Sequence, residues 1–150
     1  MKKKLTFLGV ILLIPLMTAC GNNKNELKCT EKLVDEIVIR EYTYEFNNND
    51  ELENVFLEEV IDFSKVEDLS EMDCGTIEEC MKEAHNEFNE CENDSYYEEC
   101  KISKETKTGL TITSKLSKKG IEAIKEDLSV DKLTKEVINK NVKDREMICK

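Results

Sequence analysis

The sequence predicts an α+β domain: an antiparallel sheet of two hairpins, with an amphipathic helix and C-terminal helices packed on one face. Three observations support this fold class. Residues 41–46 and 110–116 alternate apolar and polar side chains, which is typical of half-buried strands. Residues 76–91 repeat apolar side chains at helical spacing. Residues 117–138 contain two shorter helical patterns, each behind a residue suited to cap a helix.

The N-terminal residues have the composition of an export signal. Lysines at positions 2–4 precede an apolar run from Leu5 to Met17, which is too short to cross a bilayer as a folded helix. Pro15 interrupts this run, and polar residues 21–25 follow at once. These features argue against a transmembrane anchor and indicate a flexible tether after the signal.

The end of the signal, Leu16-Met17-Thr18-Ala19-Cys20, resembles the lipobox of bacterial lipoproteins. That resemblance implies that the Cys20 thiol receives a diacylglyceryl group and that cleavage falls between Ala19 and Cys20. Several acyl chains would hold the protein at a membrane, since each buried methylene contributes about 0.8 kcal/mol. The alternative is an ordinary secretory signal that is cleaved near Ala19. The predicted parts are a signal peptide (1–19), a lipidated cysteine with a tether (20–26) and one domain (27–150).

The first predicted hairpin joins a strand over residues 38–46 to a strand over residues 52–63. The apolar face of the second strand carries Val55, Leu57, Ile61 and Phe63. Between the strands, Asn47–Asp50 form a turn cluster, because Asn and Asp tolerate a left-handed backbone. The cluster lacks the glycine and the spaced glutamate of a calcium loop, so we predict a plain turn.

The most regular helical pattern covers residues 76–91. Thr76 and Glu79 form a capping box at its start. The apolar positions Met81, Ala84 and Phe88 are expected to be buried against the sheet. His85 falls on the polar face, where we expect a solvated side chain.

A second hairpin and two helices complete the domain. Residues 98–104 and 109–116 flank a polar stretch and predict the two strands. Ser117 is expected to cap one helix and Ser129 another. Residues 147–149 predict a short terminal strand.

Six cysteines follow Cys20, and an even number in an exported chain predicts three disulfides. Zinc binding is disfavoured, because the chain has no Cys-x-x-Cys pair and a single histidine. The predicted pairs are Cys29 with Cys149, Cys74 with Cys80, and Cys91 with Cys100.

The pairing follows from the predicted elements. Cys80 and Cys91 lie on one helix, about 16 Å apart at 1.5 Å per residue, which is beyond disulfide reach. Cys74 precedes the helix and can fold back to Cys80, while Cys91 at its end can reach Cys100 across a short loop. The rival pair, Cys80 with Cys100, would leave Cys74 and Cys91 at opposite helix ends.

Beyond the lipobox, the order of elements resembles the small YehR-type bacterial lipoproteins, whose function is uncharacterised. The likeness lies in the aromatic strand Tyr42-Thr43-Tyr44-Glu45-Phe46 before an asparagine-rich turn, and in the Ile61-Asp62-Phe63 strand that follows. A single amphipathic helix and a later hairpin ending near Leu116 extend it. The resemblance implies a lipid-anchored α+β domain and lends no catalytic residues.

Composition limits the function classes. The formal charge of −11 becomes −14 once the three lysines of residues 1–19 are removed, which argues against binding nucleic acid. We expect a lipoprotein on the extracytoplasmic face of the cell membrane, a non-enzymatic binding or interaction module without cofactor or metal. Its expected partners are the membrane, through Cys20, and an envelope protein or small ligand. The alternatives are a small-solute or cation receptor and a carboxylate-based hydrolase.

The lipobox makes one direct prediction. Cells fed a clickable palmitate analogue should label the wild-type chain and leave Cys20→Ser unlabelled, because the substitution removes the acceptor thiol. Equal labelling of both chains would show that the lipid, if any, sits elsewhere.

Overall fold

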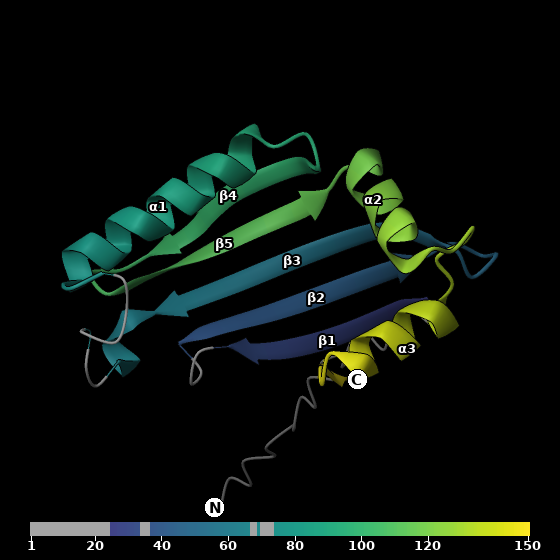
Figure 1. The fold of residues 1–150 in the computed structure, drawn as a ribbon, viewed down its shortest axis with the longest axis horizontal. Helices are drawn as coiled ribbons and strands as arrows, with labels where there is room; N and C mark the ends of the chain where they lie inside the picture. Colours follow the sequence, from purple (N-terminus) through teal and green to yellow (C-terminus); the bar gives the residue numbers. More distant parts are fainter. Residues whose placement is uncertain (1–24, 34–36, 67–68, 70–73) are drawn as a thin grey trace, which may run out of the picture.

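The computed structural model describes residues 25–33, 37–66, 69 and 74–150. Six antiparallel strands form one sheet in the order β4-β5-β3-β2-β1-β6 (Figure 1). The strands are β1 (Glu26–Leu33), β2 (Val38–Phe46), β3 (Leu52–Asp62), β4 (Tyr97–Glu105), β5 (Gly109–Leu116) and β6 (Ile148–Cys149). The helices are α1 (Ile77–Asn93), α2 (Lys118–Leu128) and α3 (Lys135–Asp144), and a 3-10 turn, η1, spans Phe63–Lys65.

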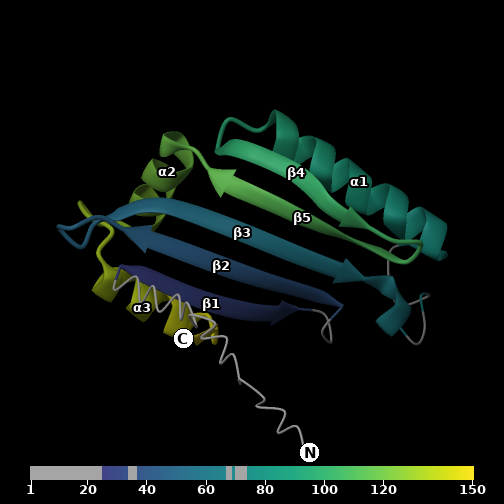
Figure 2. The same cartoon turned by 180° about the vertical axis from the view of Figure 1, so that it is seen from behind.

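Three helices pack on one face of this sheet, as the α+β prediction requires. In β2, Val38 packs in the cluster beneath α1 and Tyr44 in the cluster beneath α2 and α3. Alternate residues of a strand point to the same side, so both clusters lie on one face. Figures 1 and 2 show α1 along β4 and β5, and α3 beside β1. We call the other side the helix-free face.

The core is divided into two apolar clusters. The cluster beneath α1 contains the buried residues Ile37, Ile61, Phe63, Cys74, Cys80, Ala84, Leu110 and Ile112. The cluster beneath α2 and α3 contains Leu27, Cys29, Tyr44, Phe46, Val55, Leu133, Ile138, Val142 and Met147. The helices therefore cover the two ends of the sheet face, and the middle of β2 and β3 is left to other side chains.

The predicted helix and its cap are present. The Thr76 hydroxyl accepts a hydrogen bond from the backbone N–H of Glu79 at 3.2 Å, and α1 begins at Ile77. Ala84 is buried as predicted, but Met81 and Phe88 are only partly buried at the edge of their cluster. These longer side chains lie on the flanks of the helix, where the sheet does not enclose them.

Two local predictions require correction. Strand β1 lies outside the two predicted hairpins, and it pairs with β2 along its whole length. Its pattern is obscured because Glu31 occupies an inward position, opposite Arg40. Ser129 does not cap the last helix: it ends α2 with a left-handed backbone (φ 52°), and Thr134 caps α3. The backbone between them is held by Leu133, whose C=O accepts from Leu52 N–H at 2.7 Å.

The structure contains three disulfides, Cys29–Cys149, Cys74–Cys80 and Cys91–Cys100, the pairs expected from the sequence. The terminal strand β6 lies beside β1 and places Cys149 directly opposite Cys29. Disulfides form and persist in oxidising compartments, so they indicate an extracytoplasmic location. In the part of the chain described here, no helix is long and apolar enough to cross a membrane.

The bridges should differ in their contributions to stability. Cys29 and Cys149 are 120 residues apart, so replacing both by Ala should cost about 4 to 5 kcal/mol in the chain-entropy model. Cys91 and Cys100 are nine residues apart, and the matched double variant should cost about 2 to 3 kcal/mol. Urea unfolding of both variants measures the difference. Equal losses would mean that loop length does not determine the effect.

Candidate functional site

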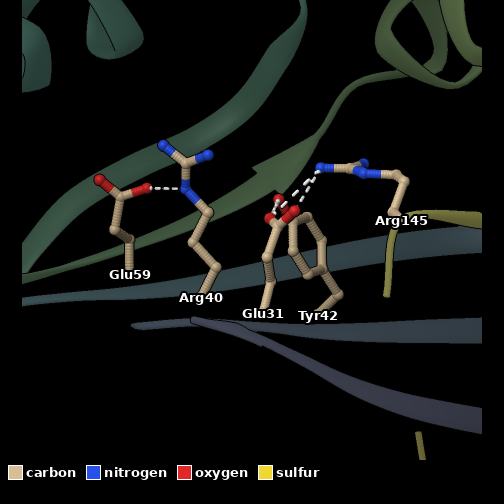
Figure 3. Close-up of polar contacts among 5 residues, drawn as sticks. All are labelled: Glu31, Arg40, Tyr42, Glu59 and Arg145. Carbon is tan, nitrogen blue, oxygen red and sulfur yellow. Dashed lines mark hydrogen bonds and ion pairs between the residues drawn. The ribbon is translucent and has the colours of Figure 1, made fainter. Parts of the chain in front are cut away.

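A row of charged side chains occupies the gap between the two apolar clusters. Antiparallel pairing places Glu31 opposite Arg40, and Arg40 opposite Glu59. We call these three residues the charged row, and Figure 3 shows them on β1, β2 and β3. Because opposite charges across neighbouring strands attract, the row supports the register of the three strands.

Arg40 is oriented by Glu59, and among the described residues most of its donors have no partner. Its Nε donates a hydrogen bond to Glu59 Oε2 (Figure 3). Burial alone would lower the pKa of Arg40, but the hydrogen bond and the negative charge of Glu59, together with Tyr42 and Glu31, raise it by more, so the guanidinium stays charged. Within the described chain, no residue bonds its two terminal nitrogens, and the side chain is 34% exposed. These nitrogens can therefore reach an external anionic group.

At the other end of the row, Glu31 joins the sheet to α3. Arg145 Nη2 donates to both carboxylate oxygens of Glu31, at 3.1 and 3.2 Å. The Tyr42 hydroxyl donates to Glu31 at 3.4 Å, and the Arg145 guanidinium lies 5.9 Å from the Tyr42 ring centre (Figure 3). Burial and the charge of Glu31 raise the pKa of Tyr42, so the hydroxyl stays a donor. This end of the row is internally paired.

Two hollows lie beside α1, on either side of the Arg40–Glu59 pair. The larger has a volume of about 230 Å³ and the smaller about 150 Å³. Both are lined by Arg40, Glu59 and Glu87, and we call the two hollows together the α1 groove. The larger hollow has an apolar wall that includes Val38, Ile61, Phe63 and Ala84.

The helix side of the groove is acidic. Glu83 and Glu87 lie one turn apart on α1, where like charges repel. Burial, and then the charge of Glu59, raise the pKa of Glu87, while Arg40 opposes the shift. The groove is thus lined by three carboxylates and one guanidinium. The excess of negative charge attracts a cationic group to the helix side.

Disulfides hold α1 near both ends. Cys74–Cys80 ties the first turn of the helix to a residue two positions before its cap, and Cys91–Cys100 ties its last turn to β4. Glu83 and Glu87 lie between these two attachments. The Cys91–Cys100 bridge attaches the acidic helix to the sheet at one end, which favours a preorganised binding site.

The helix-free face carries a second, more open surface. A hollow of about 400 Å³ there is lined by Phe56, Lys115 and the cross-strand pair of Glu41 and Glu58. Phe56 is 36% exposed, and the Lys115 ammonium lies 5.9 Å from its ring centre. Ile148, at the β6 edge, is 64% exposed. The mixture of apolar and charged side chains on the helix-free face resembles a protein contact surface.

The predicted site residues are distributed as follows. Ala19 and Cys20 lie outside the described residues, and their roles stay predictions. Cys74, Cys80 and Cys91 line the α1 groove as disulfides. His85 is not simply solvated, because its Nε2 lies 3.0 Å from Glu105 Oε1 on β4. Among the described residues, no group of three His, Cys, Asp or Glu side chains is arranged to hold a metal ion.

Sequence reasoning missed the charged row, although a signal was present. Arg40 lies between Val38 and Tyr42 at the inward positions of the same strand. Glu59 likewise falls between the inward residues Leu57 and Ile61. A charge at an inward position of an alternating strand is uncommon unless it is paired. Two such charges on adjacent predicted strands therefore indicated a polar site within the covered face.

Comparisons of the chain with known family models, with curated proteins and with solved structures found no significant match. The resemblance to YehR-type lipoproteins therefore stays a prediction, and the function must be argued from the geometry of the site.

Tyr44, a buried inward residue of β2, should make the folded state sensitive to alkali. Burial raises the pKa of Tyr44 to about 12, from an ordinary value of 10.0. The neutral phenol is favoured in the folded state, so its contribution is complete below pH 10 and is lost as the pH rises toward 12. Two pKa units correspond to about 3 kcal/mol.

Urea unfolding at several pH values between 9 and 12 tests this prediction. The wild type should lose more stability over this interval than Tyr44→Phe, which keeps the ring and removes the titrating group. Parallel losses in both proteins would mean that Tyr44 does not control the alkaline transition.

Proposed function

We propose that this chain is a lipid-anchored, extracytoplasmic binding protein of the bacterial cell envelope, and that the α1 groove is its ligand site. The disulfides support export, and the lipobox-like sequence before Cys20 supports anchoring. The observation that carries the proposal is the groove itself. It combines the Arg40 guanidinium, whose terminal nitrogens have no hydrogen-bond partner among the described residues, the Glu83 and Glu87 carboxylates on the helix side, and an apolar wall.

Such a combination suits binding of a small polar ligand. Ligand sites in general pair an apolar lining with a few placed polar groups. Here the polar groups lie on three elements, β2, β3 and α1, and the Cys91–Cys100 bridge joins α1 to β4 of the same sheet. The role proposed is recognition, because the groove offers charge complementarity and an apolar contact surface.

A thermal-shift experiment tests this role. The purified chain is scanned with a panel of amino acids, diamines, monosaccharides and divalent cations. At least one compound should raise the melting temperature, since a ligand that binds only the folded state stabilises it. The shift should disappear in Glu87→Gln, which lines the groove, and persist in Arg145→Gln, which does not.

A second candidate function is docking of an envelope protein on the helix-free face, favoured by the exposure of Phe56 and Ile148. A photo-cross-linking residue at position 56 discriminates the two. A protein adduct at that position, together with no thermal shift from any compound in the panel, would favour docking over ligand binding.

A further inference from the structure

We infer that the α1 groove binds a free α-amino acid as a zwitterion, with the carboxylate on Arg40, the ammonium between Glu83 and Glu87, and an aliphatic side chain in the larger hollow. This inference rests on the proposed function and specifies its ligand. Three features of the groove carry it.

Arg40 provides the carboxylate site. A guanidinium has five N–H donors in a planar fork that matches a carboxylate. Among the described residues only Glu59 bonds this guanidinium, through Nε, and that bond sets the orientation of the plane. In Figure 3 the dashed line to Glu59 ends on Nε, and neither terminal nitrogen of Arg40 carries one. An incoming carboxylate can therefore bind them without displacing Glu59.

Glu83 and Glu87 provide the ammonium site on the opposite wall. An ammonium group has three donors and no acceptor, and two carboxylates one helical turn apart can share them. Without a cation these carboxylates repel each other and Glu59, consistent with the raised pKa of Glu87. A bound ammonium would relieve this repulsion.

The two sites select a ligand that carries both charges. A simple carboxylate would bind Arg40 but would be repelled by the carboxylates of Glu59, Glu83 and Glu87. A simple amine would bind the carboxylates but leave Arg40 with unused donors. An α-amino acid carries an ammonium and a carboxylate on one carbon, so both walls are satisfied at once.

The larger hollow determines the side chain. At about 30 Å³ for each water-sized group, a volume of 230 Å³ holds about eight such groups. This is close to the number of non-hydrogen atoms in a whole leucine or valine molecule, whose charged groups meet Arg40, Glu83 and Glu87 at the walls of the same hollow. Val38, Ile61, Phe63 and Ala84 offer the side chain an apolar surface.

Isothermal titration of the purified exported chain, in detergent micelles, tests the inference with three probes of similar shape. L-leucine carries both charges, leucinamide lacks the carboxylate, and N-acetyl-L-leucine lacks the ammonium. Leucine should bind at least about tenfold more tightly than either analogue, because each charged hydrogen-bonded contact is lost with its group. Equal affinity for leucine and leucinamide would overturn the inference in favour of a simple cation site.

Two variants assign the contacts. Arg40→Gln should remove the preference for leucine over leucinamide, and Glu87→Gln should remove the preference for leucine over N-acetyl-leucine. Glu87→Gln leaves the Arg40–Glu59 pair intact, so it stays informative if Arg40→Gln is unstable by circular dichroism. Arg145→Gln is the matched control, because Arg145 pairs with Glu31 outside the groove, and it should bind leucine as the wild type does.

Other outcomes separate this inference from the proposed function. No binding of leucine at millimolar concentration, by a folded protein, would overturn the inference. If a diamine or a sugar still produces a thermal shift that Glu87→Gln abolishes, the groove remains a ligand site for another class of compound.

Discussion

The pairing of β2 with β3 is the constraint on which the rest of the structure depends. Its register sets Val38 beside Ile61, Arg40 beside Glu59 and Tyr44 beside Val55. A slip of one residue in either strand would turn its inward side chains to the helix-free face. Both apolar clusters and the charged row would then be lost together, so the fold and the candidate site have the same origin.

The charged row is costly to place within a covered face, and its position limits that cost. Taking ionised side chains out of water is unfavourable unless each finds a partner. Here Arg40 is bonded to Glu59 and Glu31 to Arg145, and the Arg40 and Arg145 side chains are 34% and 46% exposed. The row therefore retains water access in the gap between α1 and α3. That same access makes Arg40 available to a ligand.

The disulfides and the groove are connected through α1. A helix with a polar outer face and only two buried residues, Cys80 and Ala84, makes few apolar contacts with the sheet. Its covalent attachments near both ends compensate for this thin packing. The Cys91–Cys100 bridge joins α1 to β4, so a bridge that stabilises an acidic domain also helps to arrange the proposed ligand contacts.

The sequence by itself determined the elements whose causes are local. The Thr76 cap and the apolar spacing of α1, the alternation of β2 and the positions of the cysteines relative to that helix depend on residues close together in the chain. Tertiary structure decided the rest, because it depends on partners far away. Strand β1 is held by β2 and β6, and the start of α3 shifts to Thr134 beside the buried Leu133. Arg40, Glu59 and Glu87 meet only because β2, β3 and α1 pack together. No local sequence pattern predicts which inward charges will face one another, and the candidate site forms only where these charged residues come together.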